Sequence, residues 1–275
     1  MFGKPERVGF WRTQSDAPQV ECFMKSSYLM AAVTVSLLNS IAFAAPWEPF
    51  VIRNSTSGNI APTISVSGNQ TEIVTSLGGQ KAGLGTSAAD GAKVSQILAL
   101  SIDRLDDTSR FTPGSGQAVA PYLNIWITNG TKYAVIANEP SNAEWAGGLQ
   151  WDMTWNILKT KTLKVYENSD KSWLPNNGVG LTFNDVASFT IKAPTPTEIA
   201  AGWAGLGGGA PRELGTNEAY GVNWVFGDTL SNYVSGGEGY IVADASISVV
   251  PEPASLSIVG LGAAALLMRR RRAGK

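Results

Sequence analysis

Two apolar segments near the ends of the chain, Tyr28–Ala45 and Ala254–Met268, limit the part that can fold as a globular body to the roughly 200 residues between them. Only 16% of the residues are charged, and 30 are glycine. This composition is typical of a β-sheet protein with many turns rather than of a helical protein. We therefore expect an all-β body over 45–250, with an N-terminal signal helix and a C-terminal hydrophobic helix on either side.

Residues 24–44 have the pattern of a secretory signal peptide. Lys25 precedes an apolar run of about ten residues, and small residues, Ala42 and Ala44, stand at the −3 and −1 positions of a cleavage site. We predict export by the Sec machinery and cleavage after Ala44, with an uncleaved membrane helix as the alternative. Residues 1–23 show no export pattern, and we interpret them as an extension from a start codon upstream of Met24, the alternative being a long n-region.

The C-terminal segment, 251–275, contains three elements in order. Pro251, Glu252 and Pro253 come first, the apolar stretch follows, and a basic cluster of Arg269, Arg270, Arg271 and Arg272 ends it. A helix of about 15 residues spans only about 22 Å, less than the roughly 30 Å hydrocarbon core of a bilayer. The arginines favour the cytoplasmic side, which places the body, 45–250, outside the membrane.

This order of elements resembles the PEP-CTERM sorting signal of Gram-negative bacteria, although it covers only about 22 residues. The resemblance implies that exosortase, a membrane transpeptidase-like enzyme, recognises Pro251, Glu252 and Pro253. It also implies a protein of the cell envelope, outer surface or extracellular space that is transiently anchored in the inner membrane. Many proteins with this signal come from bacteria that secrete exopolysaccharide. A simple tail anchor is the alternative.

The body shows the pattern of strands broken by turns. Asn129-Gly130 joins two alternating runs over 122–137, which predicts a β-hairpin with Leu123, Ile125 and Ile127 facing the core. Other expected strands are Thr71–Leu77, Val94–Leu105, Leu163–Glu167, Val186–Lys192, Tyr220–Phe226 and Tyr240–Val249. Their number and spacing favour a jelly-roll-like β-sandwich.

Helix is expected to be minor and confined to two places. Aromatic and apolar spacing predicts a short helix over Trp151–Leu158, and Thr195 with Glu198 forms a weak capping box. The long irregular stretch Pro194–Ala219 is interpreted as a structural cover, with a ligand loop as the alternative.

Most catalytic constellations are missing from the composition. The chain has no histidine, and its one cysteine, Cys22, precedes the export signal, so a Ser-His-Asp triad, a thiol nucleophile and an ordinary zinc site are excluded. We therefore expect a protein without enzymatic activity. A glycosidase needs only two carboxylates and stays a remote alternative, with candidates Glu144, Asp152, Glu213, Glu218 and Asp228.

Charge and acidic clusters bear on partners and cofactors. Residues 45–250 contain 12 basic and 18 acidic residues, a net charge of −6, which argues against nucleic acid. The densest acidic group is Asp103, Asp106 and Asp107. It is a weak candidate for calcium, because its spacing does not match an EF-hand, and we expect no cofactor.

Eight tryptophans remain after the export signal. Exposed tryptophan rings stack on sugars, whereas buried ones fill the core of a sandwich that has no disulfides. Core packing is expected for most of them, and Trp126 and Trp145 are the best candidates for exposed carbohydrate contacts. The sequence thus predicts a non-enzymatic surface or matrix protein, with an exopolysaccharide-binding module as the alternative.

Overall fold

The computed structural model describes residues 46–107, 121–138, 143–145, 151–166, 170–200, 219–227 and 237–250. All of them belong to one compact unit, Ala42–Lys275, and we call these described residues the folded body. The extension over 1–23, the signal peptide over 24–44 with Ala42 and Ala44, and the segment over 251–275 lie outside the described residues.

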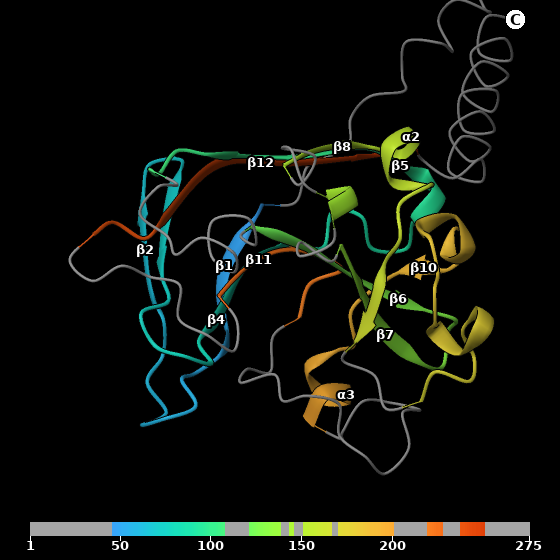
Figure 1. The fold of residues 1–275 in the computed structure, drawn as a ribbon, viewed down its shortest axis with the longest axis horizontal. Helices are drawn as coiled ribbons and strands as arrows, with labels where there is room; N and C mark the ends of the chain where they lie inside the picture. Colours follow the sequence, from blue (N-terminus) through green and yellow to red (C-terminus); the bar gives the residue numbers. More distant parts are fainter. Residues whose placement is uncertain are drawn as a thin grey trace, which may run out of the picture. The chain divides into compact units, whose positions relative to one another are not determined.

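The folded body is built mainly from strands in two antiparallel sheets, with few helices (Figure 1). The first sheet has seven strands in the order β1-β4-β11-β6-β7-β9, and β10 also pairs with β6. Its strands are β1 Glu48–Arg53, β4 Lys81–Thr86, β6 Tyr122–Thr128, β7 Tyr133–Ala137, β9 Lys164–Tyr166, β10 Thr190–Ile191 and β11 Val222–Phe226.

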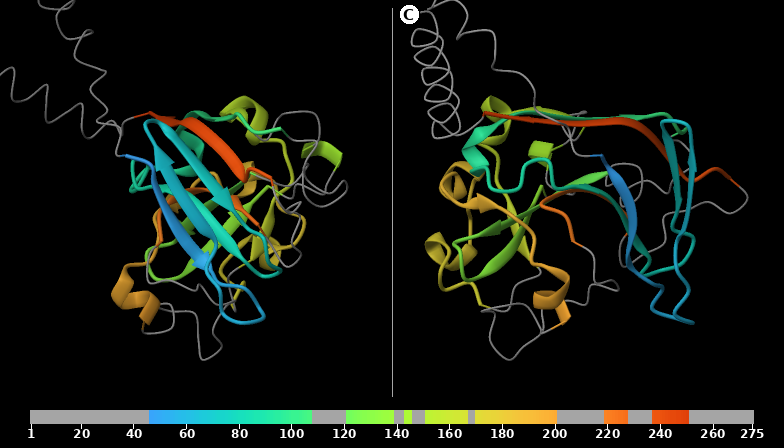
Figure 2. Two further views of the ribbon diagram at one scale, coloured as in Figure 1. Left: turned by 90° about the vertical axis from the view of Figure 1, so that its left-hand side faces the viewer. Right: turned by 180° about the vertical axis from the view of Figure 1, so that it is seen from behind.

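The second sheet has five strands in the order β2-β3-β12-β5-β8. Its strands are β2 Thr63–Ser67, β3 Gln70–Val74, β5 Ile97–Arg104, β8 Asp152–Thr154 and β12 Tyr240–Val249. Figure 2 shows β12 running alongside β5. The short helices are η1 Val94–Gln96, η3 Ala143–Trp145, α2 Trp155–Leu158, η4 Pro175–Gly178, η5 Phe183–Val186 and α3 Pro196–Ala200.

One cluster of buried side chains contains residues from both sheets. Ile73, Leu100 and Val242 from the second sheet lie in the same cluster as Leu123 and Ile125 from the first. The expected hairpin is present as β6 and β7, paired from Asn124↔Ala137 to Thr128↔Tyr133. Leu123, Ile125 and Ile127 face this shared core, as the alternation predicts.

The opposite face of β6 is buried as well, which the alternation did not predict. Trp126 packs with Tyr133, Val135 and Ala193, and Ile199 of α3 contacts this cluster. In Figure 1, α3 lies below β6 and β7, on the side away from β12. The described ends of the irregular stretch Pro194–Ala219 therefore act as a cover. The expected capping box also forms, because Glu198 Oε2 accepts from the Thr195 N–H at 2.7 Å and Thr195 Oγ1 accepts from the Glu198 N–H at 3.3 Å.

Glycine explains how a second aromatic layer fits over β4. At Gly83 and Gly85, a side chain would point away from the shared core. A Cβ on Gly83 would lie 2.6 Å from Phe50 Cε1. A Cβ on Gly85 would lie 2.5 Å from Tyr220 Cδ2. The centroids of the Phe50 and Tyr220 rings lie 5.0 Å apart, so the two rings pack against each other. The lack of a side chain at Gly83 and Gly85 thus lets these rings lie close to β4.

Candidate functional site at the end of strand β12

β12 is the strand that leads into the C-terminal segment. It occupies the centre of the second sheet, where it pairs with β3 on one side and β5 on the other. Tyr240 and Val242 alternate into the shared core, as expected for a half-buried strand. The pairing to β5 is interrupted between Ala243 and Ser246, where Asp244 has a positive φ of 48°, and it resumes to end at Val249↔Ile97.

Val250 is held by both its backbone groups. Its N–H donates to the carbonyl of Gln96 at 2.8 Å, and its own carbonyl accepts from Gln96 Nε2 at 3.1 Å. The other side-chain atom of Gln96 is also engaged, because Oε1 accepts from the Lys93 N–H at 2.6 Å. Gln96 therefore links the capping box of η1 to the last residue before Pro251. We call this arrangement the Gln96 clamp.

The start of β12 is fixed by a buried ion pair. Arg104 Nη2 and Asp106 Oδ2 are 2.9 Å apart, and the two side chains are 2% and 1% exposed. Asp106 Oδ1 also accepts from the Ile241 N–H at 3.1 Å. The Arg104 guanidinium lies 5.3 Å from the centre of the Tyr240 ring and 5.7 Å from that of Trp151. Burial is the main reason that the pKa of Tyr240 is raised to about 12, and Arg104 opposes that rise.

The acidic group considered for calcium is not assembled as a ligand set. Asp106 is engaged by Arg104, whereas Asp103 and Asp107 are exposed. Within the folded body, no group of three acidic side chains is placed to hold a metal ion. The spacing of the three aspartates alone does not show that Asp106 is already paired with Arg104.

The two tryptophans expected to be exposed are buried. Trp126 is 3% exposed and Trp145 is 0% exposed. Trp126 lies beneath the cover described above, and Trp145 donates from Nε1 to the Thr162 carbonyl at 3.0 Å while contacting Phe183 edge-on. The prediction of exposure was therefore wrong. All the described tryptophans contact buried clusters: Trp47, Trp126, Trp145, Trp151, Trp155, Trp173 and Trp224.

Of the five carboxylates considered for glycoside hydrolysis, two lie among the described residues. Glu144 Oε1 accepts from the Thr162 N–H at 2.8 Å, so this carboxylate has a local structural partner. Asp152 lies exposed on β8. The remaining three, Glu213, Glu218 and Asp228, lie outside the described residues.

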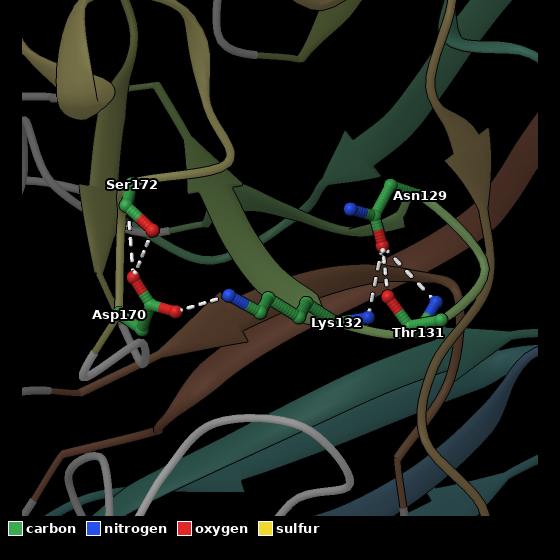
Figure 3. A network of polar contacts seen from close by, with 5 residues as sticks. All are labelled: Asn129, Thr131, Lys132, Asp170 and Ser172. Atoms are coloured by element: carbon green, nitrogen blue, oxygen red, sulfur yellow. Dashed lines mark hydrogen bonds and ion pairs between the residues drawn. The ribbon is translucent and has the colours of Figure 1, made fainter.

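A polar network beside the hairpin turn has a structural role (Figure 3). Asn129 Oδ1 accepts from the Thr131 and Lys132 N–H groups at 3.0 and 2.9 Å, which fixes the turn. Lys132 Nζ donates to Asp170, which also accepts from the Ser172 hydroxyl at 2.6 Å. These hydrogen bonds hold the pKa of Asp170 well below its ordinary value.

The structure is that of a β-sheet protein in which β12, the last described strand, leads directly into the C-terminal segment. Residues 249–272, which begin at the last residue of β12 and continue into that segment, match the PEP-CTERM protein-sorting motif, which confirms the resemblance seen in the sequence. The chain is therefore an exported protein that is sorted to the cell envelope through its C-terminal signal, and the motif implies recognition by exosortase. No curated protein and no solved structure matches the chain.

None of the helices in the described ranges is long and apolar enough to cross a membrane. Pro251, Glu252, Pro253 and Arg269–Arg272 lie outside those ranges, so their predicted roles stay sequence predictions. Gln96 was not identified from the sequence, because nothing in the local pattern pairs it with a residue 154 positions away.

Proposed function

We propose that this protein is a non-enzymatic component of the cell surface or extracellular matrix, delivered through its C-terminal signal. The observation that carries the proposal is the start of the PEP-CTERM motif at Val249, the last residue of β12. The tail thus follows the folded body without a spacer. We also propose that the tail enters the inner membrane transiently and that exosortase processes it near Pro251, Glu252 and Pro253.

The arrangement proposed for the folded body is a jelly-roll-like β-sandwich. Both sheets contribute to one buried cluster, and the chain passes repeatedly from one sheet to the other, as from β3 to β4 and from β11 to β12. A sandwich of this kind supplies a stable exported body without a disulfide. All the described tryptophans contact buried clusters, and Trp126, Trp145 and Trp224 are themselves buried, which supports a structural use of these rings over sugar stacking.

Mass spectrometry of the protein isolated from cells with and without exosortase tests the sorting proposal. We expect a C-terminus near Pro253 when exosortase is present and a retained Arg269–Arg272 when it is absent. Replacing Pro251, Glu252 and Pro253 by alanine should give the retained form in both strains. An identical C-terminus in all these samples would contradict processing by exosortase.

The role of the body is tested on the mature secreted protein. A structural component should pass over insoluble polysaccharides without retention and release no reducing sugar from them. Its thermal unfolding should not change on addition of a calcium chelator, because no cofactor is proposed. Retention on one polysaccharide would instead favour the carbohydrate-binding alternative.

A further inference from the structure

The hydrogen-bond ladder of the second sheet extends to the residue immediately before the sorting element. Val249 still pairs with Ile97, and Val250 N–H and C=O are both bound to Gln96. Pro251 and Pro253 have no backbone N–H and cannot continue this ladder as donors. Val250, the last described residue, is therefore still held by the folded body, and the carbonyl of the peptide bond that leads to Pro251 is the acceptor of Gln96 Nε2.

A processing enzyme binds a stretch of substrate on both sides of the bond that it cuts, because remote contacts supply binding energy for the reaction. Here the residues on the N-terminal side of Pro251 already use their backbone groups within the folded body. Each residue that the enzyme takes up from this side must first leave the ladder. Release of Val250 is the first step, since Val249 lies deeper in the pairing with β5.

From this geometry we infer that Gln96 is a positioning residue for sorting: the Gln96 clamp limits the chain available to exosortase to Pro251 and beyond. This inference rests on the proposed function. The Gln96 side chain contributes one solvent-exposed hydrogen bond to Val250. Its loss should favour release of Val250 by roughly two- to tenfold, the equilibrium factor for the net strength of one hydrogen bond.

The discriminating variant is Gln96→Glu in the full chain. A carboxylate can still accept from the Lys93 N–H, which preserves the cap of η1, but it cannot donate to the Val250 carbonyl. Gln70→Glu, the same change on an exposed glutamine of β3, is the matched control. The rate of processing is followed by pulse-chase as loss of an epitope tag added after Lys275, in cells with and without exosortase.

We expect Gln96→Glu to be processed about two- to tenfold faster than the wild type, and Gln70→Glu at the wild-type rate. Four residues, Gly-Ser-Gly-Ser, inserted between Val250 and Pro251 should also speed processing, because they supply free chain upstream of the sorting element. In this insertion background Gln96→Glu should give no further acceleration, since the clamp no longer limits access.

Two results would overturn the inference while leaving the proposed function intact. One is a Gln96→Glu rate equal to or below that of the wild type. The other is equal acceleration by Gln96→Glu with and without the insertion, which would indicate general destabilisation of the folded body. If the wild-type tag is retained even with exosortase present, the proposed function itself fails, whatever the variants do.

Discussion

Removing the charge of Asp106 while keeping its shape is the sharpest test of how β12 is held. In Asp106→Asn, the Arg104 guanidinium stays in a site where its side chain is only 2% exposed, but it loses the Asp106 carboxylate. The amide oxygen can still accept from the Ile241 N–H, so the change isolates the ion pair. Breaking a buried pair by removing one partner costs about 3–5 kcal/mol, because a buried charge is left uncompensated.

The contacts of Arg104 with aromatic rings place the expected loss at the lower end of that range. Its guanidinium lies over Tyr240 and Trp151, and such contacts are worth up to about 2 kcal/mol when desolvated. We therefore expect Asp106→Asn to lower the free energy of unfolding by about 3 kcal/mol. This is a large share of the roughly 5–15 kcal/mol that stabilises a typical folded protein.

Urea unfolding followed by tryptophan fluorescence measures this loss. With a urea dependence of about 2 kcal/mol per molar, the midpoint should fall by about 1.5 M. Asp103→Asn, the same change at an exposed position of β5, is the control and should shift the midpoint by less than about 0.3 M. A loss below about 1 kcal/mol in Asp106→Asn would refute the assignment of a buried ion pair.

Two further predictions concern Gly83 on β4 and Asp90, which follows this strand in the chain. Gly83→Ala places a Cβ 2.6 Å from Phe50 Cε1 on a central strand and should cost about 1–3 kcal/mol, so an unchanged thermal midpoint would contradict the close approach. Asp90 is exposed as a residue, but desolvation of its carboxyl, whose Oδ1 lies next to Gly221, raises the pKa to about 6, although Lys192 opposes the rise. A raised carboxyl pKa stabilises the fold below about pH 4 and loses this stability as the pH rises through 6. Asp90→Asn should remove that fall, for a gain of about 1 kcal/mol at pH 8 after solvent screening and none at pH 4; parallel pH profiles for the two proteins would argue against it.

The sequence predicted the features that depend on local chemistry. Asn129-Gly130 marked the hairpin, and the alternation of Leu123, Ile125 and Ile127 identified the core face of β6. The C-terminal motif was also found from the sequence, since its elements follow one another without a gap. In each case the determining residues lie within about twenty positions of each other.

Features that depend on distant contacts were missed. β4 was not expected, because glycine usually weakens a strand, and its glycines are explained only by the rings of Phe50 and Tyr220 from other parts of the chain. β1 contains Pro49, which does not favour a strand, although an edge position tolerates it. Trp126 was expected to be exposed because the cover of its face comes from residues near Ala193 and beyond.

The same distinction applies within the candidate functional site. The sorting element is a local pattern in the sequence. The contacts at the two ends of β12 instead involve Gln96 and the pair Arg104–Asp106, which lie far from β12 in the sequence. β12 is thus held at its start by the buried ion pair and at its end by the Gln96 clamp. Every contact described for this strand involves residues up to Val250, so removal of the chain from Pro251 onward leaves them all in place.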